Sequence, residues 1–141
     1  MDIIIIKEPI SRAELKIIAE KRFAVDRKFL HGDSIEERWR RMTFAEQMGN
    51  IGSEVSRAGL SQGKNDTRFN NAVARALELF DLTLSDPRWR GRLLEIGRAR
   101  EVFCDAVLGG KEYDSDFSSL QSYFDQFAMI AMTDFNKKYG F

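Results

Sequence analysis

Acidic side chains at helical spacing are the first residues in this chain whose types could support chemistry. Glu78 and Asp81 are three positions apart, and Glu101 and Asp105 are four apart. These spacings place each pair on one face of a helix. Facing carboxylate pairs on neighbouring helices can bind magnesium, so a metal-dependent hydrolase is one hypothesis. The candidate polar cleft comprises Glu54, Glu78, Asp81, Arg100, Glu101 and Asp105.

Arginines beside these acids favour ion pairing over metal binding. Opposite charges at helical spacing usually form solvated or partly buried ion pairs. The basic partners here are Arg57, Arg75, Arg98 and Arg100. The segment from Glu101 to Asp105 also departs from the glutamate-rich spacing of helical nucleotide pyrophosphatases.

Arg100 falls between Ile96 and Phe103, on the apolar stripe of an expected helix. A charge in that position must be paired or reach the surface. We expect an interhelical ion pair with Glu54 or Glu78. The alternative is an anion-binding arginine inside a cleft.

Two clusters in the sequence interleave a tryptophan with arginines. They are Arg38-Trp39-Arg40-Arg41 and Arg88-Trp89-Arg90-Gly91-Arg92. Arginine binds phosphate while an aromatic ring stacks on a base, so such clusters are typical of nucleic-acid contacts. A second hypothesis assigns these contacts to Arg38, Trp39, Arg40, Arg41, Arg88, Arg90 and Arg92. The structural alternative is that both tryptophans open helices and serve the core.

The sequence contains no other motif for catalysis or ligand binding. Its one histidine, His31, and its one cysteine, Cys104, stand far apart, so no zinc-type spacing exists. There is no nucleophile elbow and no glycine-rich phosphate loop. The sequence therefore predicts no catalytic residue, no metal-ligand set and no cofactor.

Composition and charge indicate one globular domain in a reducing compartment. The chain has 141 residues, of which 43% are hydrophobic and 31% charged, with 22 basic and 22 acidic side chains. Balanced charge gives no overall attraction to nucleic acid or to an anionic membrane. A single cysteine excludes an intrachain disulfide. Because no segment approaches membrane-spanning length and residues 1–6 do not form a secretory signal, we expect a cytoplasmic protein without membrane contact.

Two regions are expected along the chain. Residues 1–33 form an N-terminal arm and a short helix, and the isoleucine-rich residues 2–7 are extended. This arm either packs on the core or pairs with a second subunit. Residues 34–141 form the helical bundle. The predicted fold is all-α: a bundle of about four amphipathic helices, with a short N-terminal extended segment and one or two short extra helices.

Capping boxes and apolar periodicity place these helices. Ser11, Ser34 and Thr43 are each followed three positions later by glutamate, which predicts a helix start. Long helices are expected from residue 44, over residues 67–84, from residue 87 to a stop at residues 109–110, and after residues 114–116. Loops are expected over residues 31–33 and 59–67. The predicted core positions are Phe44, Met48, Ile51, Val55, Ala58, Phe69, Val73, Ala76, Leu77, Phe80, Leu84, Trp89, Leu93, Ile96, Phe103, Val107, Phe117, Leu120, Phe124, Phe127 and Ala131.

Two features of these helices point to packing partners. Gly49, Gly52, Ser53 and Ser56 lie beside the apolar stripe of the first long helix, and such small residues let another helix approach closely. Of the 11 phenylalanines in the chain, four lie within residues 117–135 of the last helix. An aromatic face of this kind is either bulky core or a subunit contact.

Parts of the sequence resemble uncharacterised prokaryotic proteins. Residues 3–23 resemble the start of a family of small bacterial proteins, and residues 42–55, 76–83 and 86–89 resemble a second set of prokaryotic helical proteins. Neither resemblance implies an activity.

The layout is also similar to that of small bacterial four-helix proteins such as HEPN domains, which serve as toxin ribonucleases or as partners of small nucleotidyltransferases. Their ribonuclease motif is an arginine followed, after four to six residues, by a histidine. Here Arg27 precedes His31 with three residues between them. The resemblance therefore implies a non-catalytic, partner-binding member.

The favoured hypothesis is a non-enzymatic helical bundle that acts by binding an unidentified protein partner after self-association as a homo-oligomer. Its contact surfaces would be the isoleucine arm and the aromatic last helix. The alternatives are a nucleic-acid-associated accessory protein that uses the two Arg-Trp clusters, and the metal-dependent hydrolase.

Overall fold

Five α-helices and one short 3-10 helix make up residues 32–140, the part of the chain that the computed structural model describes. They are α2 (Gly32–Arg41), α3 (Phe44–Ser61), α4 (Asp66–Leu84), the 3-10 helix η1 (Pro87–Arg92), α5 (Leu93–Val107) and α6 (Phe117–Tyr139). These residues contain no strand, so the predicted all-α fold is confirmed. None of their helices combines the length and hydropathy that crossing a membrane requires.

The predictions for the N-terminal segment concern residues outside this range. The extended residues 2–7, the cap at Ser11, the short helix behind it and His31 all lie outside the described residues. The two-region division of the chain at residue 33 therefore stays a prediction.

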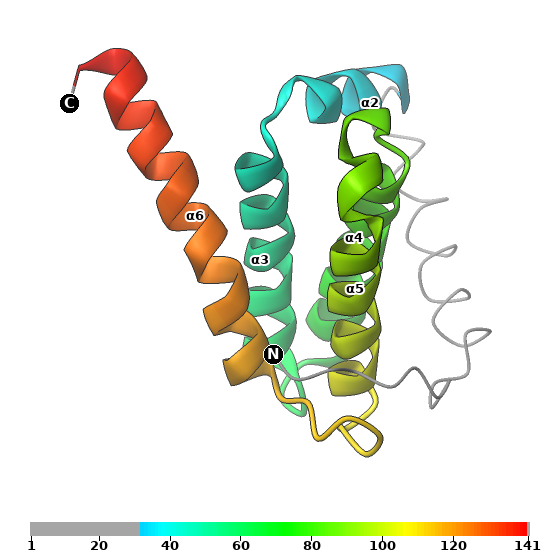
Figure 1. The fold of residues 1–141 in the computed structure, drawn as a ribbon. Helices are drawn as coiled ribbons and strands as arrows, with labels where there is room; N and C mark the ends of the chain where they lie inside the picture. The colour runs from blue at the N-terminus through cyan, green and yellow to red at the C-terminus, as the bar shows by residue number, and fades with distance from the viewer. Residues whose placement is uncertain (1–31, 141) are drawn as a thin grey trace.

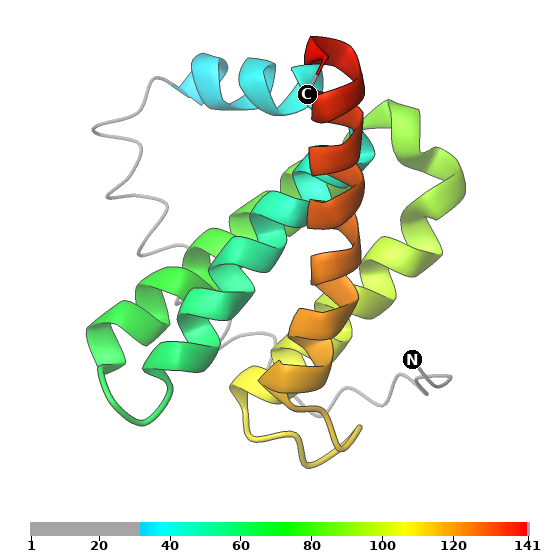
Figure 2. The same ribbon diagram turned by 90° about the vertical axis from the view of Figure 1, so that its left-hand side faces the viewer.

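The bundle consists of α3, α4, α5 and α6, which run alternately up and down (Figure 1). The middle helix α3 packs against both α4 and α6, and α5 packs mainly on α4. The short helix α2 lies across one end of the bundle, as Figures 1 and 2 both show. Because α6 is inclined to α3, its C-terminal part leaves the bundle (Figure 1).

Several helix ends follow from the capping chemistry that the sequence predicts. The Thr43 side chain accepts the N–H of Glu46, and the Glu46 carboxylate accepts the N–H of Thr43, which confirms the capping box of α3. Asp116 caps α6 in the same way with its own carboxylate. Gly109 and Gly110 adopt φ values of 102° and 74° after α5, which confirms the left-handed stop.

Other predicted boundaries are wrong by a few residues. α2 begins at Gly32, so Ser34 lies inside its first turn and not at the position before it. α3 continues through Gly59 to Ser61, and α4 begins at Asp66, so the expected loop is shorter. The carboxamide oxygen of Asn65 accepts the N–H of residue 68, and this cap starts α4 one residue before the predicted start.

The expected helix from Pro87 to Val107 is also divided in two. η1 precedes α5 because Trp89 has φ −105° and ψ 25°, outside the helical region. This change of path turns Leu93 outward, where it is 43% exposed, so its predicted place in the core is wrong.

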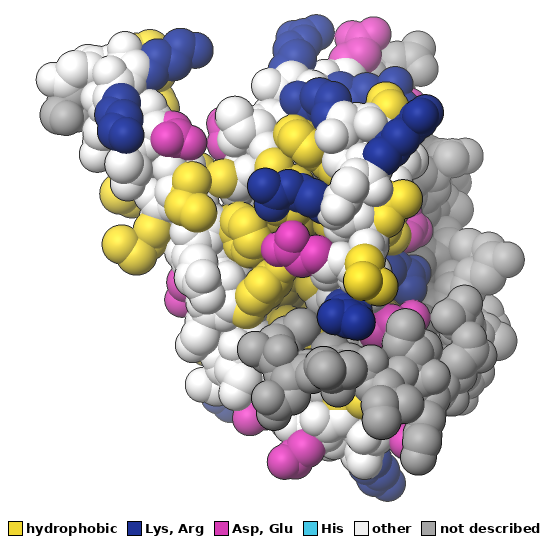
Figure 3. Space-filling view, viewed as in Figure 1, with side chains coloured by type: hydrophobic (Ala, Val, Ile, Leu, Met, Phe, Trp, Pro, Cys, Tyr) yellow, Lys and Arg dark blue, Asp and Glu magenta, His cyan; other side chains and the backbone are white. Residues whose placement is uncertain are grey.

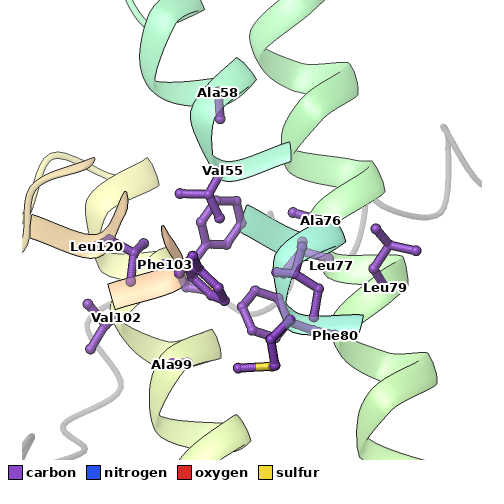
Figure 4. Close-up of a cluster of buried hydrophobic side chains, with 14 of the residues drawn as sticks. Val55, Ala58, Ala76, Leu77, Leu79, Phe80, Ala99, Val102, Phe103 and Leu120 are labelled. Atoms are coloured by element: carbon purple, nitrogen blue, oxygen red, sulfur yellow. The ribbon is translucent and has the colours of Figure 1, made fainter. Parts of the chain in front are cut away.

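Aromatic rings from three helices form the centre of the core. Phe80 of α4, Phe103 of α5 and Phe124 of α6 are fully buried. The ring centroid of Phe80 lies 5.9 Å from that of Phe103 and 6.0 Å from that of Phe124. Figure 4 shows Val55 and Leu77 pointing toward the same centre from α3 and α4. The periodic apolar residues of the sequence therefore predict the middle of the core correctly.

Glycines on α3 set how closely α6 can approach. A Cβ at Gly52 would lie 2.7 Å from the Cβ of Phe124, and a Cβ at Gly59 would lie 3.0 Å from the Cβ of Phe117. Real Cβ atoms essentially never come closer than 3.0 Å, so Gly52 leaves no room for a side chain and Gly59 leaves very little. The expectation that small residues on this helix admit another helix is confirmed, and that helix is α6.

Adding one methyl group at Gly52 tests this contact. We expect Gly52→Ala to lower the free energy of unfolding by about 1–2 kcal/mol, because overpacking costs more than the added helix propensity contributes. Gly97→Ala is the matched control, since Gly97 lies inside α5 and a Cβ there meets no atom within 4 Å. That change should raise the free energy of unfolding by about 0.5–1 kcal/mol. Urea unfolding measures both values, and equal stability of the two variants would contradict the close contact.

Candidate interaction surface

Two carboxylates of the candidate polar cleft are held in ion pairs within their own helices. Glu54 Oε1 lies 2.6 Å from Arg57 Nη1 within α3, and Glu78 Oε2 lies 3.1 Å from Arg75 Nη1 within α4. Among the described residues, no group of three or more His, Cys, Asp or Glu side chains is placed to hold a metal ion. The geometry therefore favours ion pairing over metal coordination in this set.

Arg100 forms the expected interhelical ion pair, but with a different acid. Its Nε lies 3.4 Å from Asp81 Oδ1, which joins α5 to α4. The expected partners, Glu54 and Glu78, are paired with arginines of their own helices. Because the Asp81 side chain is 65% exposed, water screens the pair, and its contribution to stability is small. Glu101 lies half-buried on α5.

Asp105 holds the loop that follows α5. It is buried, and its two carboxylate oxygens accept the N–H groups of Glu112 at 3.2 Å and Tyr113 at 3.1 Å. A buried carboxylate with both oxygens bonded to backbone donors has a structural role that its spacing from Glu101 does not reveal. Asp105 therefore anchors this loop and does not act together with the other acids of the candidate polar cleft.

The tryptophans of both Arg-Trp clusters donate hydrogen bonds to polar groups inside the fold. Trp39 is buried, and its Nε1 donates to Thr83 Oγ1 at 2.9 Å. Trp89 is half-buried, and its Nε1 donates to Gln47 Oε1 at 2.9 Å. A buried indole cannot stack on a base, so Trp39 serves the core, as the structural alternative predicts.

Gln47 and Asp86 form the centre of this buried polar network. Gln47 Nε2 donates to the Trp39 carbonyl at 2.7 Å and to Asp86 Oδ2 at 3.1 Å. Asp86 also accepts from Arg88 Nη2 at 2.7 Å, and the same Nη2 donates to the Met42 carbonyl. The network therefore joins α2, α3, α4 and η1. Its members are Trp39, Gln47, Thr83, Asp86, Arg88 and Trp89.

The hydrogen bonds from Arg88 lower the pKa of Asp86 from 3.8 to about 2, although burial acts in the opposite direction. The carboxylate is therefore ionised at neutral pH, and its charge is neutralised inside the network by the guanidinium. Sequence reasoning missed Gln47, Thr83 and Asp86 as a group, because their positions are separated by up to 39 residues.

Several arginines of the two clusters bind groups within the fold. Arg40 lies 3.1 Å from Glu36, and Arg41 lies 3.7 Å from Glu37 on the same helix. The guanidinium of Arg92 lies 4.3 Å from the centroid of the Phe44 ring. These exposed pairs contribute little energy, but they reduce the positive field that a phosphate would meet.

The first half of α6 is anchored to the bundle by a half-buried phenol. Tyr123 Oη donates to Glu95 Oε1 at 2.9 Å, and this bond joins α6 to α5. Burial, together with the bond to Glu95, raises the pKa of Tyr123 above its usual value. The hydroxyl therefore keeps its proton, and the anchor persists, at neutral pH.

The second half of α6 carries a row of large apolar side chains that face water. We call it the distal α6 face, and its residues are Met129 (71% exposed), Met132 (67%), Phe135 (53%) and Tyr139 (56%), whereas Ile130 (49%) is exposed on the opposite side of the helix. Figure 3 shows hydrophobic side chains on this projecting half and across the hollow between it and the bundle. Among these residues, only Phe135 belongs to the aromatic face that the sequence predicts for the last helix.

A groove between α3 and α6 adjoins the distal α6 face. It has a volume of about 310 Å³, and small residues of α3 line one side. Gln121 and Asp125 of α6 line the other side, with Gln121 Nε2 donating to Asp125 Oδ1 at 2.9 Å. Gln121 Oε1 is buried and has no hydrogen-bond partner among the described residues. An unmet buried acceptor is unfavourable, so this groove can accept a donor from another molecule.

Replacing Asp86 by asparagine tests the charge inside the buried network. Because the folded-state pKa of about 2 lies below 3.8, the carboxylate contributes stability above about pH 4 that is lost as the pH falls toward about 2. We expect Asp86→Asn to lower the free energy of unfolding by about 2 kcal/mol at pH 7 and to flatten its dependence on pH between those limits. Urea unfolding at several pH values measures both effects, with the exposed Asp134→Asn as control. An acid dependence equal to that of the unsubstituted chain would contradict the assignment.

Comparisons with known proteins add no information about the function of this chain. No known protein family, curated protein or solved structure matches the chain. The resemblance to prokaryotic helical proteins and HEPN domains therefore stays a prediction. The distal α6 face and the adjoining groove are the features from which a function can be argued.

Proposed function

We propose that this chain is a non-enzymatic helical bundle that works by protein–protein association, and that its first partner is a second copy of itself. The distal α6 face carries this proposal, because it places four large apolar side chains in water on one side of a half-helix. Contiguous apolar patches on proteins usually mark contact sites. Burying such a patch is favourable in proportion to the area removed from water.

The size of the distal α6 face fits a subunit contact. A large side chain has roughly 200 Å² of surface, so four that are between 53% and 71% exposed offer on the order of 500 Å². Two copies that cover this face on each other would bury about 1,000 Å² in total, the size of a weak, reversible interface. A two-fold pair uses the same patch on both subunits, so no second surface is needed.

The contacts of the charged residues support association over the other two hypotheses. The acids that suggested hydrolysis include Glu54, Glu78 and Asp105, which are bound to arginines or backbone N–H groups. Of the residues assigned to nucleic acid, Trp39 is buried and Arg88 is bound to Asp86. These interactions stabilise the bundle, whereas the side chains of the distal α6 face are each more than half exposed.

Sedimentation velocity over a range of concentrations tests the proposal. We expect a dimer whose fraction rises between about 1 and 100 µM, a range typical of small interfaces. The double variant Met132→Glu with Phe135→Glu should raise the dissociation constant at least about tenfold, because two charges would be buried on each side.

Leu60→Glu provides the matched control, since Leu60 is also 71% exposed but lies on α3, away from the distal α6 face. It should leave the dissociation constant unchanged. Circular dichroism and thermal unfolding of each variant establish that the bundle still folds. A chain that stays monomeric at about 100 µM, or that responds equally to both sets of changes, would overturn the proposal.

A further inference from the structure

The spacing of residues along α6 selects one side of this helix for pairing. Asp125, Met129, Met132, Asn136 and Tyr139 follow one another at intervals of four, three, four and three positions. This is the spacing of a coiled-coil seam, in which one stripe faces a partner helix. Since Asp125 lines the groove between α3 and α6, the seam continues from the distal α6 face into that groove.

The two ends of this seam carry complementary hydrogen-bonding groups. At its N-terminal end, the Asp125 carboxylate is exposed and Gln121 Oε1 is a buried acceptor without a partner among the described residues. At its C-terminal end, Tyr139 is 56% exposed and has a phenolic O–H that can donate. Acceptor and donor are therefore both present on one copy, at opposite ends of the same stripe.

Met132 lies midway between these two ends. Asp125 is seven positions before it and Tyr139 is seven positions after it. Seven residues of α-helix span roughly 10 Å, so the two ends are equally distant from Met132 along the axis. The two hydrogen-bonding ends of the seam therefore exchange places when a second copy is turned end over end about Met132.

We propose, as a refinement that rests on the proposed function, that two copies pair through antiparallel α6 helices with the two-fold axis at Met132. In this register Met132 packs on its counterpart, and Met129 packs on the partner helix one turn away. Tyr139 of the partner subunit then enters the groove between α3 and α6. Its hydroxyl donates to Gln121 Oε1 or to the neighbouring Asp125.

A parallel pair would lack these contacts. It would place Asp125 beside Asp125 of the partner subunit, and like charges at close range repel each other. It would also leave Tyr139 at the far end from the acceptors, so Gln121 Oε1 would stay unsatisfied. The antiparallel arrangement avoids the repulsion between the two Asp125 side chains. It also gives Gln121 Oε1 a donor from a second copy of the same chain.

Cysteine cross-linking of the full chain under mild oxidation tests this register. The native Cys104 is buried, so it does not compete with introduced thiols. Because a disulfide needs Cα atoms within about 7 Å, Met132→Cys should form a covalent dimer at the two-fold axis. The matched control is Ile130→Cys, which is also exposed but lies on the opposite side of α6 and should not cross-link.

A mixture of two variants distinguishes antiparallel from parallel pairing. Asp125→Cys and Tyr139→Cys chains should cross-link with each other when mixed, and neither should cross-link alone. Parallel pairing predicts the reverse, with each variant linking to itself. Tyr139→Phe, which removes only the donor, should raise the dissociation constant about five- to tenfold.

The outcomes separate this register from the proposed function. A chain that stays monomeric overturns both. A chain that dimerises without a Met132→Cys cross-link, or in which Asp125→Cys links to itself, overturns the antiparallel register alone. An unchanged dissociation constant for Tyr139→Phe would overturn the hydrogen bond to the groove.

Discussion

The contact between Gly52 of α3 and Phe124 of α6 is the constraint on which the arrangement of this bundle depends. Without a side chain at Gly52, Phe124 reaches the α3 backbone and places its ring against Phe80 in the core. This contact holds the first half of α6 on α3. Since α6 has 23 residues, is inclined to the 18-residue α3 and meets Gly49 of α3 at Ala128, its second half extends beyond the bundle. One close approach thus produces both a tightly packed core and an exposed apolar half-helix.

A buried polar network fixes the end of the bundle at which α2 lies. Gln47 and Asp86 bind groups from α2, α3 and η1, and Thr83 adds α4 through Trp39. Buried polar groups are favourable only when they are hydrogen-bonded, so this end tolerates few alternative arrangements. The sequence suggested that the two Arg-Trp clusters contact nucleic acid. In the structure they contribute Trp39, Arg88 and Trp89 to this network. The bundle is therefore fixed at one end by polar bonding and along its length by close apolar packing.

Features that depend on neighbouring residues, such as helices and their apolar sides, were predicted correctly from the sequence. Contacts between segments that are distant in the sequence were not. Apolar periodicity located the core from Phe44 to Phe124, because a helical stripe is a local pattern. The partner of Arg100 was predicted wrongly, since choosing Asp81 over Glu78 depends on how α4 and α5 pack. Gln47 appeared as an ordinary polar residue, because its hydrogen bonds reach 8 and 39 positions along the chain. The sequence predicted an apolar side of α6 but not which part of it is exposed. Periodicity shows which side of a helix is apolar, but it does not show where the neighbouring helix ends.

Amide hydrogen exchange along α6, measured at a low and a high protein concentration, tests the two-part role of this helix most directly. The account predicts that amides from Leu120 to Ala128 are as strongly protected as those of α3 at both concentrations, because they lie against the core. Amides from Met129 to Tyr139 should exchange rapidly in dilute solution and slow down as the concentration rises. Uniform protection along α6 at both concentrations, or rapid exchange throughout the helix, would contradict the division into a packed half and an associating half.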